Sequence, residues 1–136
     1  MVELAIVLAI VGLTTAFGLP GWRMFLDRIA VERTASEVTT ALAIARNAAV
    51  LRATRARLTI AADSLRVDEW GEDGWMTVWR WPGPDWQAVS LSVSNSSVIF
   101  GPTGVGWGTA NTAVVLRRGT KTAKITTSRV GRVKRW

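Results

Sequence analysis

The C-terminal segment SRVGRVKRW, from Ser128 to Trp136, carries the side chains best suited to binding an anion. Four of its nine residues are basic and none is acidic. Residues 1–85 hold nine Arg and ten Asp or Glu, a net charge of −1, whereas residues 86–136 hold eight Lys or Arg and no Asp or Glu, a net charge of +8. This separation of charge favours nucleic acid, anionic lipid or an acidic protein as the partner.

The spacing of these basic residues fits contacts with phosphate groups. If residues 121–128 and 129–136 form adjacent strands, their cations gather on a small area. Arg132 and Lys134 would then face the same side, because side chains alternate along a strand. Such contacts depend steeply on salt and carry no sequence specificity. The residues that we expect to contact phosphate groups, such as those of double-stranded DNA, are Arg117, Arg118, Lys121, Lys124, Arg129, Arg132, Lys134 and Arg135. The alternative is a solvated edge strand whose basic residues prevent aggregation.

No set of residues predicts catalysis. The chain has no Cys and no His, so it lacks a thiolate and the commonest general base and metal ligand. No Ser has a base in a plausible motif. The glycines between 101 and 108 lack the Lys-Ser/Thr pair of a phosphate-binding loop, and we expect a flexible loop there. We therefore expect no catalytic residue, no metal site, no cofactor and no enzymatic activity.

An acidic cluster and eight tryptophans are further features. The cluster, residues 68–73, lacks the alternating carboxylates of a calcium loop, which favours a solvated hairpin turn. Trp75, Trp79 and Trp81 share one parity, so in a regular strand all three face the same side. We expect them to pack in the core against a helix, and the alternative is a set of exposed platforms for bases. Trp22 suits a membrane interface.

The N-terminal stretch MVELAIVLAIVGLTTAFGLPGW, residues 1–22, contains one charged side chain, that of Glu3. The eighteen residues from Leu4 to Gly21 have none, which is near the lower limit for a helix that crosses a bilayer. The stretch lacks the basic start and the cleavage site of an ordinary signal peptide. A carboxylate is costly in hydrocarbon, so Glu3 either reaches the headgroups or pairs with a positive group on a neighbouring subunit.

The same helix is expected to continue beyond the apolar stretch. No Gly or Pro occurs from Trp22 to Asp63, alanine is abundant, and apolar residues recur every three to four positions. We predict one helix from about Val2 to about Thr54, bent near Pro20, because a proline removes one hydrogen bond and clashes with the preceding turn. Residues 1–22 would form its transmembrane half and residues 23–56 its amphipathic half.

Residues 57–136 have the pattern of a β-rich head. Short β-branched or aromatic segments alternate with turn signals such as Gly71 to Gly74 and Arg118-Gly119-Thr120. This pattern predicts seven or eight antiparallel strands, in one or two small sheets, packed on the amphipathic half of the helix. The predicted fold class is α+β, with a long bent N-terminal helix and a C-terminal antiparallel head.

The N-terminal stretch resembles the N-terminal helix of type IV pilins and type II secretion pseudopilins. In that family a proline follows the assembly glutamate by seventeen residues, as Pro20 follows Glu3 here, and Val2-Glu3-Leu4 lies in the matching frame. The resemblance implies a single-pass protein of the bacterial inner membrane with its head in the periplasm. It also implies assembly into a pilus or pseudopilus with other pilin or pseudopilin subunits, in which Glu3 compensates a neighbour's positive N-terminus. Because Met1 matches the third residue of mature family members, we expect the natural chain to begin upstream, with a leader that prepilin peptidase removes.

The rest of the chain resembles the GspH/FimT branch of this family. The branch has a helix-ending run Leu-x-x-Ala-Arg-x-x-Ala-x-x-Arg, matched here by Leu42, Ala45, Arg46, Ala49 and Arg52. The segment from Trp75 to Trp81 resembles its paired tryptophans, and VIFGPTGVG resembles its Ile-x-Phe-x-Pro-x-Gly. The ending ITTSRVGRVKRW resembles its closing Val-Ser-x-x-Gly-Arg-Val-Arg.

Some FimT-type minor pilins bind DNA for natural transformation through a Gly-Arg-x-Arg motif and an upstream arginine. Gly131-Arg132-Val133-Lys134 and Arg129 match these positions, with Lys in the last place; Lys keeps the charge but loses the two-pronged contact of Arg. The resemblance implies a FimT-like minor pilin that binds DNA non-specifically. The alternatives are a GspH-like pseudopilin, a structural subunit whose basic face meets a protein, and an anchored protein that enters no filament.

Overall fold

The computed structural model describes residues 1–108 and 110–136, and in this part of the chain one long helix is followed by nine strands and a short 3-10 helix. The elements are α1 (Val2–Leu51), β1 (Ala56–Ile60), β2 (Ser64–Gly71), β3 (Gly74–Pro82), η1 (Pro84–Gln87), β4 (Ser90–Val93), β5 (Ser97–Phe100), β6 (Gly106–Trp107), β7 (Thr112–Arg118), β8 (Lys121–Thr127) and β9 (Val133–Arg135). The predicted α+β class is confirmed.

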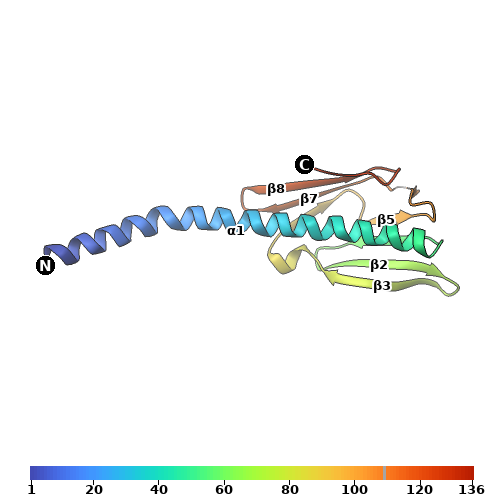
Figure 1. The fold of residues 1–136 in the computed structure, drawn as a ribbon, viewed down its shortest axis with the longest axis horizontal. Coiled ribbons are helices and arrows are strands. Elements are labelled where there is room, and N and C mark those ends of the chain that lie inside the picture. Colours follow the sequence, from blue (N-terminus) through green and yellow to red (C-terminus); the bar gives the residue numbers. More distant parts are fainter. Residues whose placement is uncertain (109) are drawn as a thin grey trace.

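Helix α1 is 50 residues long and runs unbroken through Pro20. Its ribbon curves gently in the N-terminal half, and the helix does not melt at the proline (Figure 1). It ends at Leu51, slightly before the predicted end, because Ala53 has a φ of 50°, which a continuing right-handed helix does not allow.

Two antiparallel sheets form the head. One has the strand order β3-β2-β1-β5-β6 and the other the order β4-β7-β8-β9. Both pack on the C-terminal half of α1, with β7 and β8 along one flank of the helix and β2 and β3 along the other (Figure 1). The strands outnumber the prediction because Gly106–Trp107, in the segment predicted as a flexible loop, pairs with β5.

The core lies between α1 and the inner faces of both sheets. The helix contributes small side chains that allow the strands to approach closely, and those fully buried are Ala35, Ala41, Ala45 and Ala49. The strands contribute larger side chains, among them Leu58, Leu65, Phe100, Leu116 and Ile125. Fully burying one such side chain contributes about 1.5–3 kcal/mol, so this packing holds the head on the helix.

An ion pair fixes the head at the point where α1 emerges from it. Arg118 Nε lies 2.9 Å from Asp27 Oδ1, and Arg118 Nη1 donates a hydrogen bond of 2.9 Å to the carbonyl of Gln87. Gly119 follows with a φ of 58°, and a Cβ there would lie 2.5 Å from Asp27 Oδ2. The turn between β7 and β8 is thus fitted against the helix at Asp27.

A β-bulge interrupts β3. Val67 pairs with Trp79, but the next residue along β2, Asp68, pairs with Thr77, so Val78 has no partner in β2. An extra residue reverses the in–out alternation of a strand. Residues of equal parity on the two sides of Val78 therefore point to opposite faces of the sheet.

This reversal separates the tryptophans of β3. Trp79 and Trp81 lie on the face toward α1. Trp75 lies on the opposite face, where its ring centroid is 5.2 Å from that of Trp70 and 4.4 Å from the Arg57 guanidinium carbon. The prediction that the three tryptophans of β3 share one side is wrong. It relied on all three having odd residue numbers, and residue numbers do not reveal the extra residue of a β-bulge.

Asp68 is buried on that opposite face, with 1% of its side chain exposed. Its carboxylate accepts hydrogen bonds from Thr77 Oγ1 at 2.7 Å and from Arg57 Nη2 at 2.8 Å, and Arg66 Nε lies 3.2 Å away. Burial alone would raise the pKa of this carboxyl. The hydrogen bonds from Thr77 and Arg57, with the charges of Arg66 and Arg57, outweigh burial and lower the pKa below its ordinary value of 3.8.

We predict that Asp68→Asn lowers the free energy of unfolding by about 1–3 kcal/mol at neutral pH, because hydrogen bonds to a charged group are lost. The folded-state pKa lies below the unfolded-state pKa, so the carboxylate stabilises the fold above about pH 4 and this contribution disappears as the pH falls through the folded-state value. Urea unfolding in detergent micelles, followed by circular dichroism, measures the difference between the two proteins. A difference that stays constant on acidification would contradict this role of Asp68.

Candidate functional site

Three of the predicted DNA-binding cations share the outer side of the four-stranded sheet. Ile125 of β8 is buried against α1, so Lys124 and Thr126 point outward. Arg117 of β7 and Lys134 of β9, which pairs with Thr126, lie on the same side. We call Arg117, Lys124 and Lys134 the outer basic face. The strands that carry it contain no carboxylate, so a polyanion would meet no opposing charge there.

An exposed tryptophan borders the outer basic face. Trp136 Nε1 donates a hydrogen bond to Thr126 Oγ1 at 3.4 Å, and its backbone N–H bonds to the carbonyl of Lys124 at 2.8 Å. The Lys134 ammonium lies 3.6 Å from the centroid of the Trp136 ring, a cation–π contact that holds the ammonium at the surface. Trp136 as a whole remains 66% exposed, and its indole offers a flat face beside the cations.

Arg129 and Arg132 lie in the turn before β9, apart from the outer basic face. The turn is docked by a hydrogen bond of 2.6 Å from the Gly106 N–H to the Arg129 carbonyl and by one of 3.5 Å from Arg46 Nη1 to the Gly131 carbonyl. Arg132 and Arg46 line a groove of about 350 Å³ between this turn and α1. We call it the tail groove.

Arg132 lies just before strand β9, which carries Lys134. The strand β9 begins at Val133, so the alternation that was expected to align the two residues does not reach Arg132. Gly131 has a φ of 79°, which turns the chain just before the strand. Arg132 consequently lines the tail groove beside α1, whereas Lys134 lies on the outer side of the sheet.

The other three cations lie on the helix side of the sheet. Arg118 is paired with Asp27, and Arg135 forms an ion pair with Glu32 of α1. Lys121 lines a small groove together with Glu32 and Arg28. Two of the eight predicted DNA-binding residues are thus engaged with carboxylates of the helix, and their charges also help to hold the sheet on α1.

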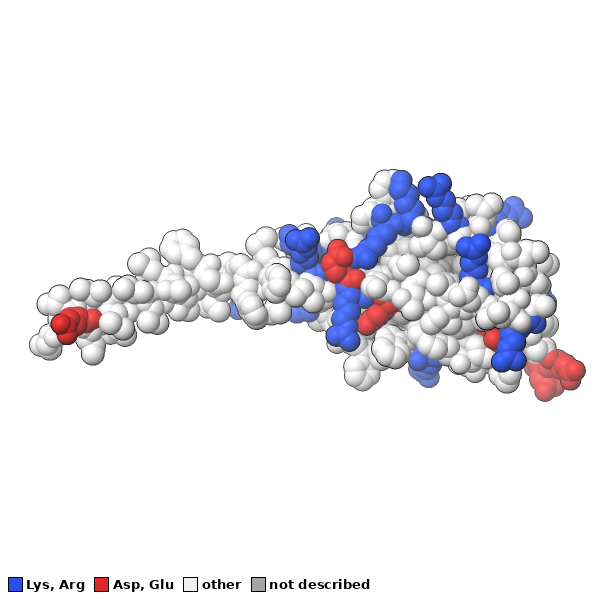
Figure 2. Space-filling model, viewed as in Figure 1, with Lys and Arg blue, Asp and Glu red and all other residues white. Residues whose placement is uncertain are grey.

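Basic side chains are most numerous along the upper rim of the head (Figure 2). Further Lys and Arg side chains lie beside acidic ones at the junction with the exposed part of α1 and on the lower side of the head, and an acidic patch lies at the opposite tip (Figure 2). The turn between β2 and β3, with Glu72 and Asp73, is at that tip (Figure 1). Within residues 1–108 and 110–136, no three His, Cys, Asp or Glu residues are grouped as metal ligands.

The N-terminal half of α1 has no cover from the rest of the chain. An 18-residue window there has a mean hydropathy of 2.2 and no buried residue, so the helix is long and apolar enough to cross a membrane. Glu3 lies in the first turn, where a carboxylate is favoured by the helix dipole. Among the described residues it has no ion pair. Pro20 lies within the exposed helix.

Arg46 lines the tail groove but is not among the eight cations predicted from the sequence. It matches a family-like run at the end of α1, but that run did not show that Arg46 reaches Gly131, 85 residues later in the sequence. The glycines of two loops form its surroundings: Cβ atoms built at Gly104 and Gly131 would lie 3.1 and 3.4 Å from the Arg46 side chain. In the sequence, glycines at these two positions were a usable signal that another part of the chain lies close to the backbone there.

We predict that Gly131→Ala destabilises the docked turn. The residue has a positive φ, and an added Cβ would lie 2.8 Å from the Gly104 carbonyl oxygen, so we expect a loss of about 1–3 kcal/mol in the free energy of unfolding. Gly108→Ala is the matched control, because Gly108 has a φ of 68° with nothing within 4 Å of its Cβ position. Urea unfolding of both variants should show the larger loss for Gly131→Ala, and equal losses would contradict close docking of the turn.

Several solved structures share this architecture. The minor pseudopilin EpsH from the type 2 secretion system of Vibrio cholerae is 11% identical, with a TM-score of 0.63 over 78% of this chain and 95% of that chain. The type IV minor pilin FimU of Pseudomonas aeruginosa, in two crystal forms, is 14% and 15% identical, with TM-scores of 0.64 and 0.67 over 77% and 81% of this chain and 91% and 90% of FimU.

No protein-family model matches the sequence, and the search of curated protein sequences finds no match. At the identities of the solved structures, the likeness establishes the fold and leaves the activity to be argued from the residues. The chain has the pilin-like fold that a minor pilin and a minor pseudopilin share, as its sequence predicts.

Proposed function

We propose that this chain is a membrane-anchored minor subunit of a type IV pilus that binds double-stranded DNA non-specifically and serves natural transformation. The observation that carries the proposal is the combination, on one molecule, of an uncovered apolar half-helix and a carboxylate-free basic face on the attached head. The first is what an anchored filament subunit requires. The second is what the phosphate backbone of DNA requires.

Exposing the N-terminal half of α1 to water is costly. Its large apolar side chains in residues 1–26 are uncovered, and these include Leu4, Ile6, Leu8, Ile10, Val11, Leu13, Phe17 and Leu19. Eighteen uncharged residues span about 27 Å as a helix, close to the thickness of a hydrocarbon core. We place residues 1–22 in the inner membrane before assembly and the head outside the cytoplasm, with residues 23–56 linking the two.

Assembly gives Glu3 and Pro20 their roles in this proposal. When the apolar half of α1 leaves the lipid and packs among the helices of other subunits, the Glu3 carboxylate stays in an apolar surrounding and needs a positive partner. A neighbour's free N-terminus supplies that charge, and Pro20 weakens α1 locally so that neighbouring helices can pack closely. The resemblance of EpsH and FimU, a pseudopilin and a pilin, supports a filament of this class.

The cations available to DNA are those that form no ion pair with a carboxylate of α1. Arg117, Lys124 and Lys134 share the outer side of the sheet, while Arg129 lies in the turn before β9 and Arg132 lines the tail groove, so both add charge near the end of the sheet. Phosphate contacts spaced over a rigid sheet fix the position of a duplex without reading its sequence. Arg118 and Arg135 are paired with Asp27 and Glu32, and Lys121 lies beside them, so we assign these three supporting roles.

The second candidate function is a GspH-like minor pseudopilin of a type II secretion system. The fold shared with EpsH favours it, as does the use of Arg118 and Arg135 to hold the sheet on α1. In that case the outer basic face contacts an acidic surface on a protein partner, and affinity for DNA is weak.

A DNA titration separates the two candidates. The full chain, in micelles of an uncharged detergent, is added to fluorescein-labelled duplex DNA at several salt concentrations, and fluorescence anisotropy reports binding. For the proposed function we expect affinity that falls steeply with salt, and a loss of roughly tenfold or more in Arg132→Gln/Lys134→Gln. Each phosphate contact removed should also reduce the slope of log K against log salt by about one.

The control for this titration is Arg52→Gln/Arg80→Gln, which removes the same charge from exposed positions without an ion pair among the described residues. It should retain most of the affinity. If both double variants lose affinity equally, the binding reflects net charge alone. That result, or no binding at low salt, would overturn DNA uptake in favour of the pseudopilin.

A further inference from the structure

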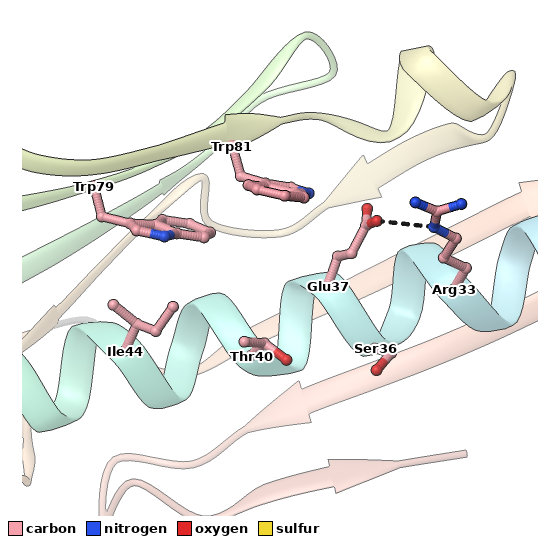
Figure 3. Close-up of a pocket in the computed structure, with 7 residues that line it drawn as sticks. All are labelled: Arg33, Ser36, Glu37, Thr40, Ile44, Trp79 and Trp81. Carbon is pink, nitrogen blue, oxygen red and sulfur yellow. Dashed lines mark hydrogen bonds and ion pairs between the residues drawn. The ribbon is translucent and has the colours of Figure 1, made fainter.

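A slot lies on the other flank of α1, away from the outer basic face. It has a volume of about 300 Å³ and is lined by Trp79 and Trp81 of β3 on one side and by Arg33, Ser36, Glu37, Thr40 and Ile44 of α1 on the other. Figure 3 shows the two indole rings above the helix, with the Glu37–Arg33 ion pair at one end of the slot. β3 is the edge strand of its sheet, so no further strand closes this side.

The two indole rings form a stepped aromatic platform. Their planes are 7° apart and their centroids 6.2 Å apart, and each ring turns one face toward the helix (Figure 3). Trp79 packs against the core, which fixes its ring, while Trp81 stays 45% exposed. The β-bulge at Val78 brings both rings to this side of the sheet. Exposed apolar area of this kind, with polar groups around it, is typical of an interaction site.

The slot holds two donor-only groups, the indole N–H groups, and two hydroxyls that can donate or accept. Glu37 already accepts hydrogen bonds from Arg33 Nε at 3.3 Å and from Gln87 Nε2 at 3.0 Å. The Ser36 and Thr40 hydroxyls and both indole N–H groups have no hydrogen bond to any described residue. An indole N–H only donates. The slot therefore complements a ligand that is flat, apolar and rich in acceptors.

We propose that this slot binds a proline-rich segment of a partner protein in the polyproline II conformation. Such a segment has no internal hydrogen bonds, so its carbonyl groups remain free to accept, and its prolines have no N–H to satisfy. Pyrrolidine rings stack on aromatic faces, and aromatic-lined grooves with tryptophan donors are the surfaces that recognise these segments. The indole N–H groups and the Ser36 and Thr40 hydroxyls bond the carbonyls.

Other ligands match the lining less well. A saccharide carries as many donors as acceptors, whereas the acceptors of the slot are the Ser36 and Thr40 hydroxyls and the Glu37 carboxylate, which already accepts from Arg33 and Gln87. A single-stranded nucleic acid would bring phosphates close to that carboxylate. The inference concerns neither the DNA-binding face nor the membrane anchor, so its failure would leave the proposed function unaffected.

The test measures the binding of a fluorescein-labelled oligoproline peptide to the full chain in detergent micelles by fluorescence anisotropy. We expect saturable binding, and no binding of a Gly-Ser peptide of equal length. Trp81→Ala should weaken binding roughly tenfold or more, because the exposed half of the platform is lost. Ser36→Phe, at an exposed helix position, should also abolish binding by filling the slot while leaving both tryptophans in place.

Trp136→Ala is the matched control, because Trp136 is also exposed but lies beside the outer basic face. Its affinity for oligoproline should equal that of the unchanged chain. The proposal is overturned if oligoproline does not bind, or if Trp81→Ala and Trp136→Ala weaken binding equally. It is also overturned if a labelled saccharide or single-stranded oligonucleotide, and not oligoproline, binds in a way that Trp81→Ala abolishes.

Discussion

The packing of two sheets on the C-terminal half of α1 is the contact on which the rest of this structure depends. Four fully buried alanines of the helix let the strands approach closely, and side chains such as Phe100 and Leu116 fill the space between them. The same helix then leaves the head at Asp27 with no further cover. The head thus covers the apolar side chains of one half of α1. Those of the other half are uncovered, and contact with lipid or with other helices would remove them from water.

This division also explains how the basic residues are used. Where the four-stranded sheet meets the helix, Arg118 and Arg135 are paired with Asp27 and Glu32 and belong to the architecture of the head. Where the sheet faces outward, Lys124 and its neighbours meet no carboxylate and remain available to a partner. A count of charge along the sequence gives the total, and the strand register decides which charges are free.

The sequence allowed the long helix, the antiparallel head and the pilin-like fold to be predicted, because helical period, alanine content and the spacing of Glu3 and Pro20 are local properties. The failure concerns register, because an extra residue at Val78 moves Trp75 to the other face of the sheet. Contacts such as Arg46 with Gly131, and the slot between β3 and α1, join segments far apart in the chain, so no local pattern contains them.

Cysteine labelling can show whether the N-terminal half of α1 is buried in a membrane or among other helices, because the chain has no cysteine. Nothing in the chain covers Gly12, so Gly12→Cys would react freely in water, as would Thr122→Cys on the exposed face of β8. In membranes from cells producing the full chain, we predict that a membrane-impermeant maleimide modifies Thr122→Cys, and Gly12→Cys only after denaturation. Equal modification of both positions in intact membranes would show that this half of α1 is exposed to water.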